Sequence, residues 1–167
     1  MDNMININVL MCKKTDENIT CIENIFDTIG WENKSISFDI VTIINLIHFT
    51  RNKFTLIYTI EKLNDNNKNK AMLLDIKELT SDKSMENTSN KQKHHFKSSL
   101  RDTGQSIFSE HFSDIEFLGC GYYELQVHML PEEETSWKKN SDDFLNKLCG
   151  EKEYIKCTYG FQIVPVV

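Results

Sequence analysis

The residue types most capable of binding a metal ion lie in one part of the chain, where His94 and His95 are followed by Glu110 and His111. Imidazole nitrogens and carboxylate oxygens are common ligands of zinc. Adjacent histidines on an extended chain, however, point to opposite faces, so they rarely bind the same ion. No second close pair of residues supplies the missing ligands. The sequence therefore predicts solvated loop histidines, with no metal and no cofactor.

Residues that could carry out nucleophilic or acid–base chemistry are also poorly placed. Cys120 and His128 are the cysteine–histidine pair to consider, but eight residues of extended strand would separate them by roughly 26 Å. A general acid–base pair needs one carboxyl group in an apolar setting beside another, whereas Asp39 and Glu124 are expected on the outward faces of strands. Gly119-x-Gly121 precedes a strand and offers no helix N-terminus to a phosphate. We therefore expect that the protein is not an enzyme.

Two charged segments are the candidate binding surfaces. Residues 83–101 are locally basic, and residues 132–153 are mostly acidic. Such runs are usually solvated surface, and the alternative is a basic docking loop for an acidic partner. Trp137 lies among charged residues that would not bury it, and tryptophan is enriched in interface hot spots. Trp31 is expected to anchor the core or a loop. The predicted partner-binding residues are Lys91, Lys93, His94, His95, Lys97 and Trp137.

The composition limits the class and the location of the protein. A net charge of −6 and a pI near 5.4 argue against nucleic-acid binding, which normally requires a basic surface. No stretch approaches the ~20 apolar residues of a membrane span, and the N-terminus lacks the features of a signal peptide. The five cysteines are odd in number and show no CxxC spacing, which is typical of thiols in a reducing compartment. We expect a cytoplasmic protein, and the abundance of Asn, Ile and Lys is typical of an AT-rich genome.

Alternation of apolar and polar residues predicts the strands that position these side chains. The clearest is 122–129, with Tyr123, Leu125 and Val127 on one face and polar residues on the other, as in a half-buried antiparallel strand. Residues 53–61 and 71–79, separated by a polar Asn/Asp turn, predict a hairpin. Further strands are expected over 4–11, 19–29, 35–46 and 154–166. A short helix is expected over 141–150, with a serine at its start and a glycine at its end.

These elements predict one domain over residues 1–167, a mainly β, antiparallel β-sandwich of about seven to eight strands with one short helix. Inserted loops are expected at about 80–95 and 131–150. Residues 96–117 show neither a clean period of two nor one of 3.6, and we expect only a short strand or helical turn near 107–112.

Three segments share a pattern with a known family. Residues 12–29 give a strand ending near Cys12, a turn and a second strand with Phe26-Asp27-x-Ile29. Residues 53–63 lead to a polar turn, and residues 121–127 follow a Gly-x-Tyr-x-Leu-x-Val pattern. In these features the chain resembles a bacterial family of unknown function whose members are small immunoglobulin-like β-sandwiches. Asn24 stands where a small residue is expected. The resemblance implies an immunoglobulin-like fold, and it implies no activity and no functional residue.

The expected function is a non-enzymatic protein-interaction module. It would meet its partner through the inserted loops or through an exposed strand edge that accepts a β-strand. Unpaired sheet edges also favour a homodimer. The alternatives are a small-ligand or carbohydrate-binding β-sandwich and an accessory protein of a mobile element or of host defence. Neither nucleic acid nor membrane is expected as a partner.

Overall fold

A computed structural model describes residues 4–16, 19, 21–32, 35–47, 53–63, 70–80, 103–130, 144–145, 147–148 and 154–166. Nine strands lie in this part of the chain: β1 (Met4–Thr15), β2 (Ile22–Ile25), β3 (Thr28–Trp31), β4 (Ser35–Ile47), β5 (Lys53–Leu63), β6 (Lys70–Thr80), β7 (Thr103–Glu116), β8 (Gly121–Leu130) and β9 (Ile155–Pro165). Within the same residues, no helix is long and apolar enough to cross a membrane. The prediction of a mainly β protein is confirmed.

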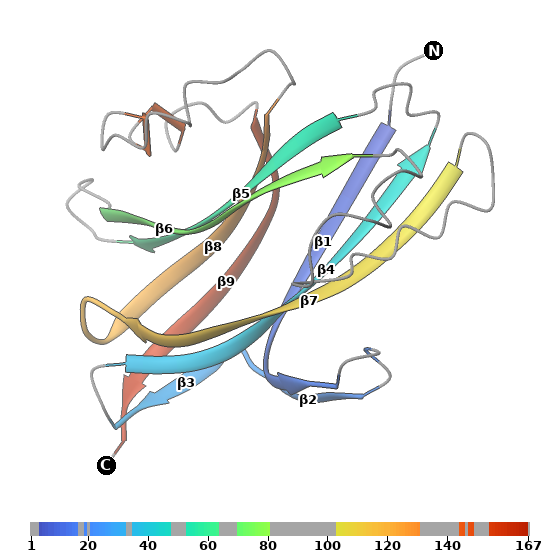
Figure 1. Cartoon of the computed structure of the whole chain (residues 1–167). Coiled ribbons are helices and arrows are strands. Elements are labelled where there is room, and N and C mark those ends of the chain that lie inside the picture. Colours follow the sequence, from blue (N-terminus) through green and yellow to red (C-terminus); the bar gives the residue numbers. More distant parts are fainter. Residues whose placement is uncertain are drawn as a thin grey trace.

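The strands form two sheets. One has four strands in the order β2-β1-β4-β7, and the other has five in the order β3-β9-β8-β5-β6. Figure 1 shows them as two layers, with β1, β4 and β7 opposite β5, β6, β8 and β9. Neighbouring strands are antiparallel except for β3, which pairs with β9 in parallel.

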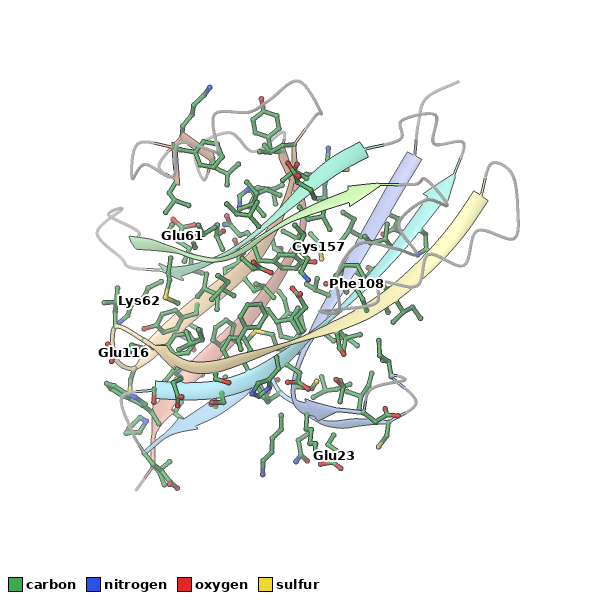
Figure 2. The ribbon with its side chains drawn as sticks, viewed as in Figure 1. Glu23, Glu61, Lys62, Phe108, Glu116 and Cys157 are labelled. Carbon is green, nitrogen blue, oxygen red and sulfur yellow. The ribbon has the colours of Figure 1, made fainter. Side chains whose placement is uncertain are left out.

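The inner faces of the two sheets form the main core. Buried apolar residues alternate along β1, β4, β5 and β8, as the period of two requires. Tyr58 of the five-stranded sheet also bonds across the core, its hydroxyl lying 2.9 Å from Oγ1 of Thr42 in the other sheet. Figure 2 shows the side chains that fill the space between the layers, with Phe108 and Cys157 labelled among them. The buried members of this core are Ile7, Val9, Met11, Phe38, Ile40, Ile44, Leu56, Tyr58, Ile60, Phe108, Phe117, Tyr123, Leu125, Val127, Phe161 and Ile163.

The chain changes sheets between β2 and β3. The backbone N–H of Phe26 donates to Met11 O at 3.2 Å in the four-stranded sheet, and Asp27 O accepts from Gln162 N at 2.7 Å in the five-stranded sheet. Residues 19–29 therefore do not form the single strand that we expected. Two strands of four residues each take their place, and the periodicity breaks between them, because Phe26 and Ile29, three residues apart, both pack against the core.

The segment 96–117, for which we expected only a short strand or helical turn near 107–112, contains β7, a strand of 14 residues. A strand therefore lies where one was allowed for, but it is much longer than expected. Its alternation is hidden because a charged residue, Glu110, points into the core while the apolar Ile107 is 44% exposed. Asp114 has a φ of +55°, and the register with β4 shifts between Ile36 and Phe38. These irregularities break the period that a sequence pattern relies on.

The turn from β7 into β8 depends on two glycines. Gly119 has a φ of +95° and Gly121 a φ of +146°, conformations that residues with a Cβ rarely adopt. A Cβ on Gly121 would also lie 3.0 Å from the side chain of Lys62. The hydroxyl of Tyr123 donates to Gly119 O at 2.6 Å, which ties the start of β8 back to the turn.

The outer face of the five-stranded sheet is partly covered as well. Ile57 and Leu130 form a second apolar cluster with Phe144 and Leu148. These last two are among the four described residues of the expected helix 141–150, all four of which are helical. The rest of that segment lies outside the described residues, as do the expected loops at about 80–95 and 131–150 for the most part, so the short helix stays a prediction.

Leu125 tests the assignment of the core face, because it is fully buried between the sheets. We expect Leu125→Asp to prevent folding, since an isolated carboxylate in this core would have no partner. Loss of the cooperative thermal transition, measured by circular dichroism, would confirm the expectation. A melt unchanged from the wild type would contradict the alternation of β8.

Candidate functional site

The residues predicted to bind a partner, Lys91, Lys93, His94, His95, Lys97 and Trp137, all lie outside the described residues. Of the suspected metal ligands, Glu110 and His111 are described. Glu110 points into the core and His111 points outward, so the two cannot share an ion. Nowhere in the described ranges do three or more His, Cys, Asp or Glu side chains gather in a group that could hold a metal ion.

A cysteine, an aspartate and a histidine lie side by side on the outer face of the four-stranded sheet. Cys12 on β1 is the register partner of Asp39 on β4, and Asp39 is the partner of His111 on β7. Asp39 Oδ1 lies 2.6 Å from His111 Nδ1. Asp39 Oδ2 accepts from the backbone N–H of Thr15 at 2.6 Å and from its hydroxyl at 3.0 Å. The aspartate is buried, which corrects the prediction that it is simply an outward residue.

These residue types occur in catalytic triads, but their order does not suit catalysis. The aspartate stands between the thiol and the imidazole, so the histidine is not placed to take a proton from Cys12. Burial and, to a smaller extent, the nearby Asp39 carboxylate together raise the pKa of the Cys12 thiol to about 11. A thiol held in this form is a poor nucleophile. The arrangement instead joins the end of β1 to β4 and β7.

A buried ion pair closes one side of the molecule. Lys77 on β6 and Glu110 on β7 are in direct contact, and both side chains are almost fully buried. The two strands are the edges of their respective sheets, so this pair bridges the two layers. Lys77 Nζ also lies 3.9 Å from Asp75 Oδ2 and 5.6 Å from the centre of the Phe108 ring. Burial lowers the pKa of Lys77 to about 8, while Asp75 acts in the opposite direction.

A third polar arrangement lies on the outer face of the five-stranded sheet, and we call it the polar row: Glu61, Glu124, Gln126 and His128. Glu61 on β5 faces Glu124 on β8 across the ladder. Gln126 Nε2 donates to Glu61 Oε2 at 3.1 Å and to Glu124 Oε1 at 2.7 Å. His128 Nε2 lies 3.0 Å from the hydroxyl of Thr59. In the described part of the molecule, Gln126 Oε1 and His128 Nδ1 are buried without a hydrogen-bond partner.

The polar row follows the face that the sequence predicts to be outward, but its environment differs from the prediction. Tyr122 at one end is 62% exposed, whereas Gln126 is 4% exposed and His128 is fully buried. Alternation identifies which side chains share a face, and it gives no signal that a second layer covers that face. Burial lowers the pKa of His128 to about 4. The imidazole is therefore neutral near pH 7, with one nitrogen as donor and the other as acceptor.

An apolar surface lies beside the polar row, and we call it the apolar end: Leu63, Leu118 and Tyr122. Leu63 and Tyr122 are register partners on β5 and β8. Leu118 precedes β8 in the glycine turn, and its carbonyl accepts from Lys62 Nζ at 2.9 Å. Leu63 is 45% exposed, Leu118 58% and Tyr122 62%. Trp31 packs behind this end, its ring carbons lying 3.6 Å from the position of a Cβ on Gly119.

The ion pair gives a test by substitution. Lys77→Met should lower the free energy of unfolding by about 3–5 kcal/mol, because the Glu110 carboxylate would stay buried without its cation. The double variant Lys77→Met/Glu110→Leu should recover most of that loss, since no unpaired charge remains. Urea denaturation of the wild type and the two variants measures both changes. A double variant as unstable as the single one would contradict the pairing.

His128 gives a test by pH. Its pKa is about 4 in the folded chain and about 6.5 when exposed, so the unfolded chain takes up the proton first as the pH falls. The contribution of the neutral His128 to stability is fully present above pH 6.5. As the pH falls from 6.5 to 4, the free energy of unfolding decreases by roughly 3 kcal/mol in total. We expect His128→Gln to lose stability less steeply over this range in urea titrations. An identical pH dependence in wild type and variant would rule out a buried neutral imidazole.

Comparison with known proteins assigns no family to the chain. No protein-family model matches it, and no curated protein matches it. Among solved structures, β-glucosidase from Listeria innocua in complex with glucose is similar at a TM-score of 0.48 and 6% identity, over 99% of this chain and 17% of that one. The complex of that enzyme with isofagomine gives the same values. The chain thus spans less than a fifth of the length of these enzymes, and a likeness at this level carries over none of their properties.

Proposed function

We propose that the protein is a non-enzymatic interaction module that binds a protein partner at the apolar end. The observation that carries the proposal is the grouping of exposed apolar side chains. Six large apolar side chains of the described residues are exposed, and three of them (Leu63, Leu118 and Tyr122) belong to this end. Single exposed apolar residues are ordinary, whereas contiguous ones rimmed by polar groups mark interaction sites.

The charges around the apolar end suggest the chemistry of the partner. Glu61 and Glu124 lie one ladder step from Leu63 and Tyr122, on the same face. Figure 2 shows Glu116 at this end as well, near Lys62. The ammonium group of Lys62 is engaged by the Leu118 carbonyl and lies over the Tyr123 ring. The rim is therefore acidic, and it fits a partner that presents apolar side chains flanked by Lys or Arg.

The strand edges are a weaker candidate for the same function. β6 and β7 are both edge strands, and each directs a charged residue inward, Lys77 and Glu110. Inward-pointing charges are one of the means by which edge strands avoid pairing with other chains. This favours docking at the apolar end over strand addition or homodimerisation at these two edges.

An immunoglobulin-like fold is proposed with this function. The orders β1-β4-β7 and β6-β5-β8-β9 correspond to strands A-B-E and C′-C-F-G of that fold. The bond from the Tyr123 hydroxyl to Gly119 O stands where that fold has its tyrosine corner, at the start of strand F. A cytoplasmic location is also proposed, because Cys12, Cys21, Cys120 and Cys157 are free thiols, the form that a reducing compartment maintains.

A second candidate function is a small-ligand or carbohydrate-binding sheet face. It is favoured by the polar row, whose buried amide and imidazole keep hydrogen-bonding atoms without a protein partner.

Variants of the apolar end test the interaction proposal. A tagged chain would be used to capture proteins from lysate of the source cell, and the captured protein would then be purified and its affinity measured. Leu118→Ser combined with Tyr122→Ser should weaken binding at least about ten-fold, because buried apolar anchors dominate interface energies. Higher salt should weaken binding too if the partner is basic.

The matched control is Ile25→Ser combined with Ile107→Ser, because these residues are also exposed, at 55% and 44%, but lie on β2 and β7. It should bind like the wild type. Both double variants should keep the wild-type thermal melt, since exposed substitutions change stability by only about 0.5 kcal/mol. Equal affinity of the wild type and the Leu118/Tyr122 variant would overturn the proposal.

A further inference from the structure

The outward side chains of β8 pass from open to covered within a few residues. Tyr122 is 62% exposed, Glu124 is half-buried, Gln126 is 4% exposed and His128 is fully buried. The polar row thus crosses the boundary between the bare part of the sheet and the part beneath the second apolar cluster. Groups at such a boundary are protected from bulk water, yet they lie within a few ångströms of an open surface.

The uncovered part of the outer face of the five-stranded sheet extends over β9. Gly160 is the register partner of Glu124, and Thr158 is that of Gln126; both are exposed. A Cβ built on Gly160 would meet no atom within 4 Å, so the surface beside Glu124 is free of side chains. A flat molecule can therefore lie over Gly160, beside Glu124 of the polar row.

The hydrogen-bonding capacity of the row defines what such a molecule must offer. Both hydrogens of Gln126 Nε2 are used by Glu61 and Glu124, which leaves Gln126 Oε1 as an acceptor that needs a donor. His128 Nδ1 can donate or accept according to its tautomer, because Thr59 can fill either role at Nε2. Each of these buried atoms is destabilising when it is unpaired. A hydroxyl group of a ligand suits Gln126 Oε1, since it can donate to this acceptor, whereas His128 is fully buried.

The charges of the row select among ligand classes. An anion would be repelled by the two carboxylates, and it would find only acceptors in Glu61, Glu124 and Gln126 Oε1. A divalent cation would find two carboxylates that already accept from the Gln126 amide, and the described residues hold no group of three or more acidic, Cys or His ligands. A neutral molecule with several hydroxyl groups can instead donate to the remaining lone pairs of all three acceptors.

We propose that the polar row, with the ring of Tyr122, is a binding site for a neutral polyhydroxylated ligand of the saccharide class. The apolar face of a sugar ring would rest on Tyr122, where the exposed aromatic face is available for stacking. Its hydroxyl groups would bond to Glu61 and Glu124, and one of them would donate to Gln126 Oε1. The site shares Tyr122, Glu61 and Glu124 with the surface proposed for a protein partner, whereas Leu63 and Leu118 belong to the protein-binding surface alone.

The test is a titration of the full chain with neutral oligosaccharides (cellotriose, maltotriose and mannotriose), followed by two-dimensional NMR. We expect saturable shifts with at least one of them, centred on Tyr122, Glu124, Gln126 and Thr158, with a Kd at or below about 1 mM. Glucuronic acid and Ca²⁺ are the anionic and cationic comparison ligands, and neither should shift these residues.

Two single variants test whether the saccharide binds at the polar row. Tyr122→Ala and Glu124→Gln should each weaken the saccharide about ten-fold, as expected for a lost stacking platform or a hydrogen bond to a charged group. Leu118→Ser should leave saccharide affinity unchanged while it weakens protein binding, so the two functions can fail separately. The thermal melt of each variant shows that it is folded.

Several outcomes would overturn the proposal. One is the absence of saturable shifts at the row with every neutral oligosaccharide up to about 50 mM, a concentration that detects even very weak binding. Another is a response to Ca²⁺ alone, which would make the row a cation site. A third is saccharide binding that Tyr122→Ala and Glu124→Gln do not change. A crystal structure grown with the saccharide that shows only ordered water on Gln126 and His128 would also overturn it.

Discussion

A chain of aromatic contacts across the core fixes the two sheets relative to each other. The Phe38 and Phe112 rings of the four-stranded sheet lie 5.6 Å apart, and Phe38 continues to Phe117 at 6.3 Å. Phe117, in the turn between the sheets, meets Tyr123 edge-on at 5.2 Å, and Tyr123 stacks on Phe161 at 5.6 Å. Such pairs stabilise a structure beyond the area that they bury. The position of Tyr123 also sets the register of β8, so every outward side chain of that strand is placed by this contact.

Both surfaces proposed to bind ligands follow from that placement. Tyr123 points inward and is held to the turn by its hydroxyl, and its neighbours Tyr122 and Glu124 must then point outward. The glycine turn brings Leu118 to the same end. The buried ion pair between Lys77 and Glu110 has a different role, because it joins the edge strands of the two sheets, which would otherwise be free to separate. The proposed binding surfaces and the ion pair thus lie in different parts of the molecule.

The sequence was sufficient for the strands in which apolar residues alternate without interruption. Residues 122–129 fall within β8, and 53–61 and 71–79 fall within the antiparallel pair β5 and β6. The full length of β7 was missed because Glu110 occupies an inward position, where it pairs with Lys77 on β6. A local sequence pattern gives no sign of a pair between distant strands. The division of 19–29 was missed because the segment is a run of apolar and polar residues without a clear period, and the change of pairing partner from β1 to β9 depends on a strand that is distant in the sequence. The residues of the inserted segments that were expected to bind a partner lie outside the described ranges.

The candidate sites were only partly accessible to sequence reasoning. Cys12, Asp39 and His111 are separated by 27 and 72 residues along the chain, and only the pairing of three strands brings them together. Gln126 and His128 were assigned to the correct face, but the second layer over that face depends on Phe144 and Leu148, which follow β8 in the chain and return over it. Alternation reports the two faces of a strand, whereas burial on both faces is a property of the whole arrangement.

The parallel pairing of β3 with β9 has a mechanical consequence. Thr28 to Trp31 are paired in order with Gln162 to Pro165, and the start of β1 and the end of β9 lie at opposite ends of the molecule (Figure 1). A force that pulls these ends apart acts along the strands, so it loads the slanted hydrogen bonds of the parallel ladder together rather than one after another. The short strand β3 therefore holds β9 through hydrogen bonds that must break together. This geometry resists a force along the strands more than a force that separates the pairs one at a time.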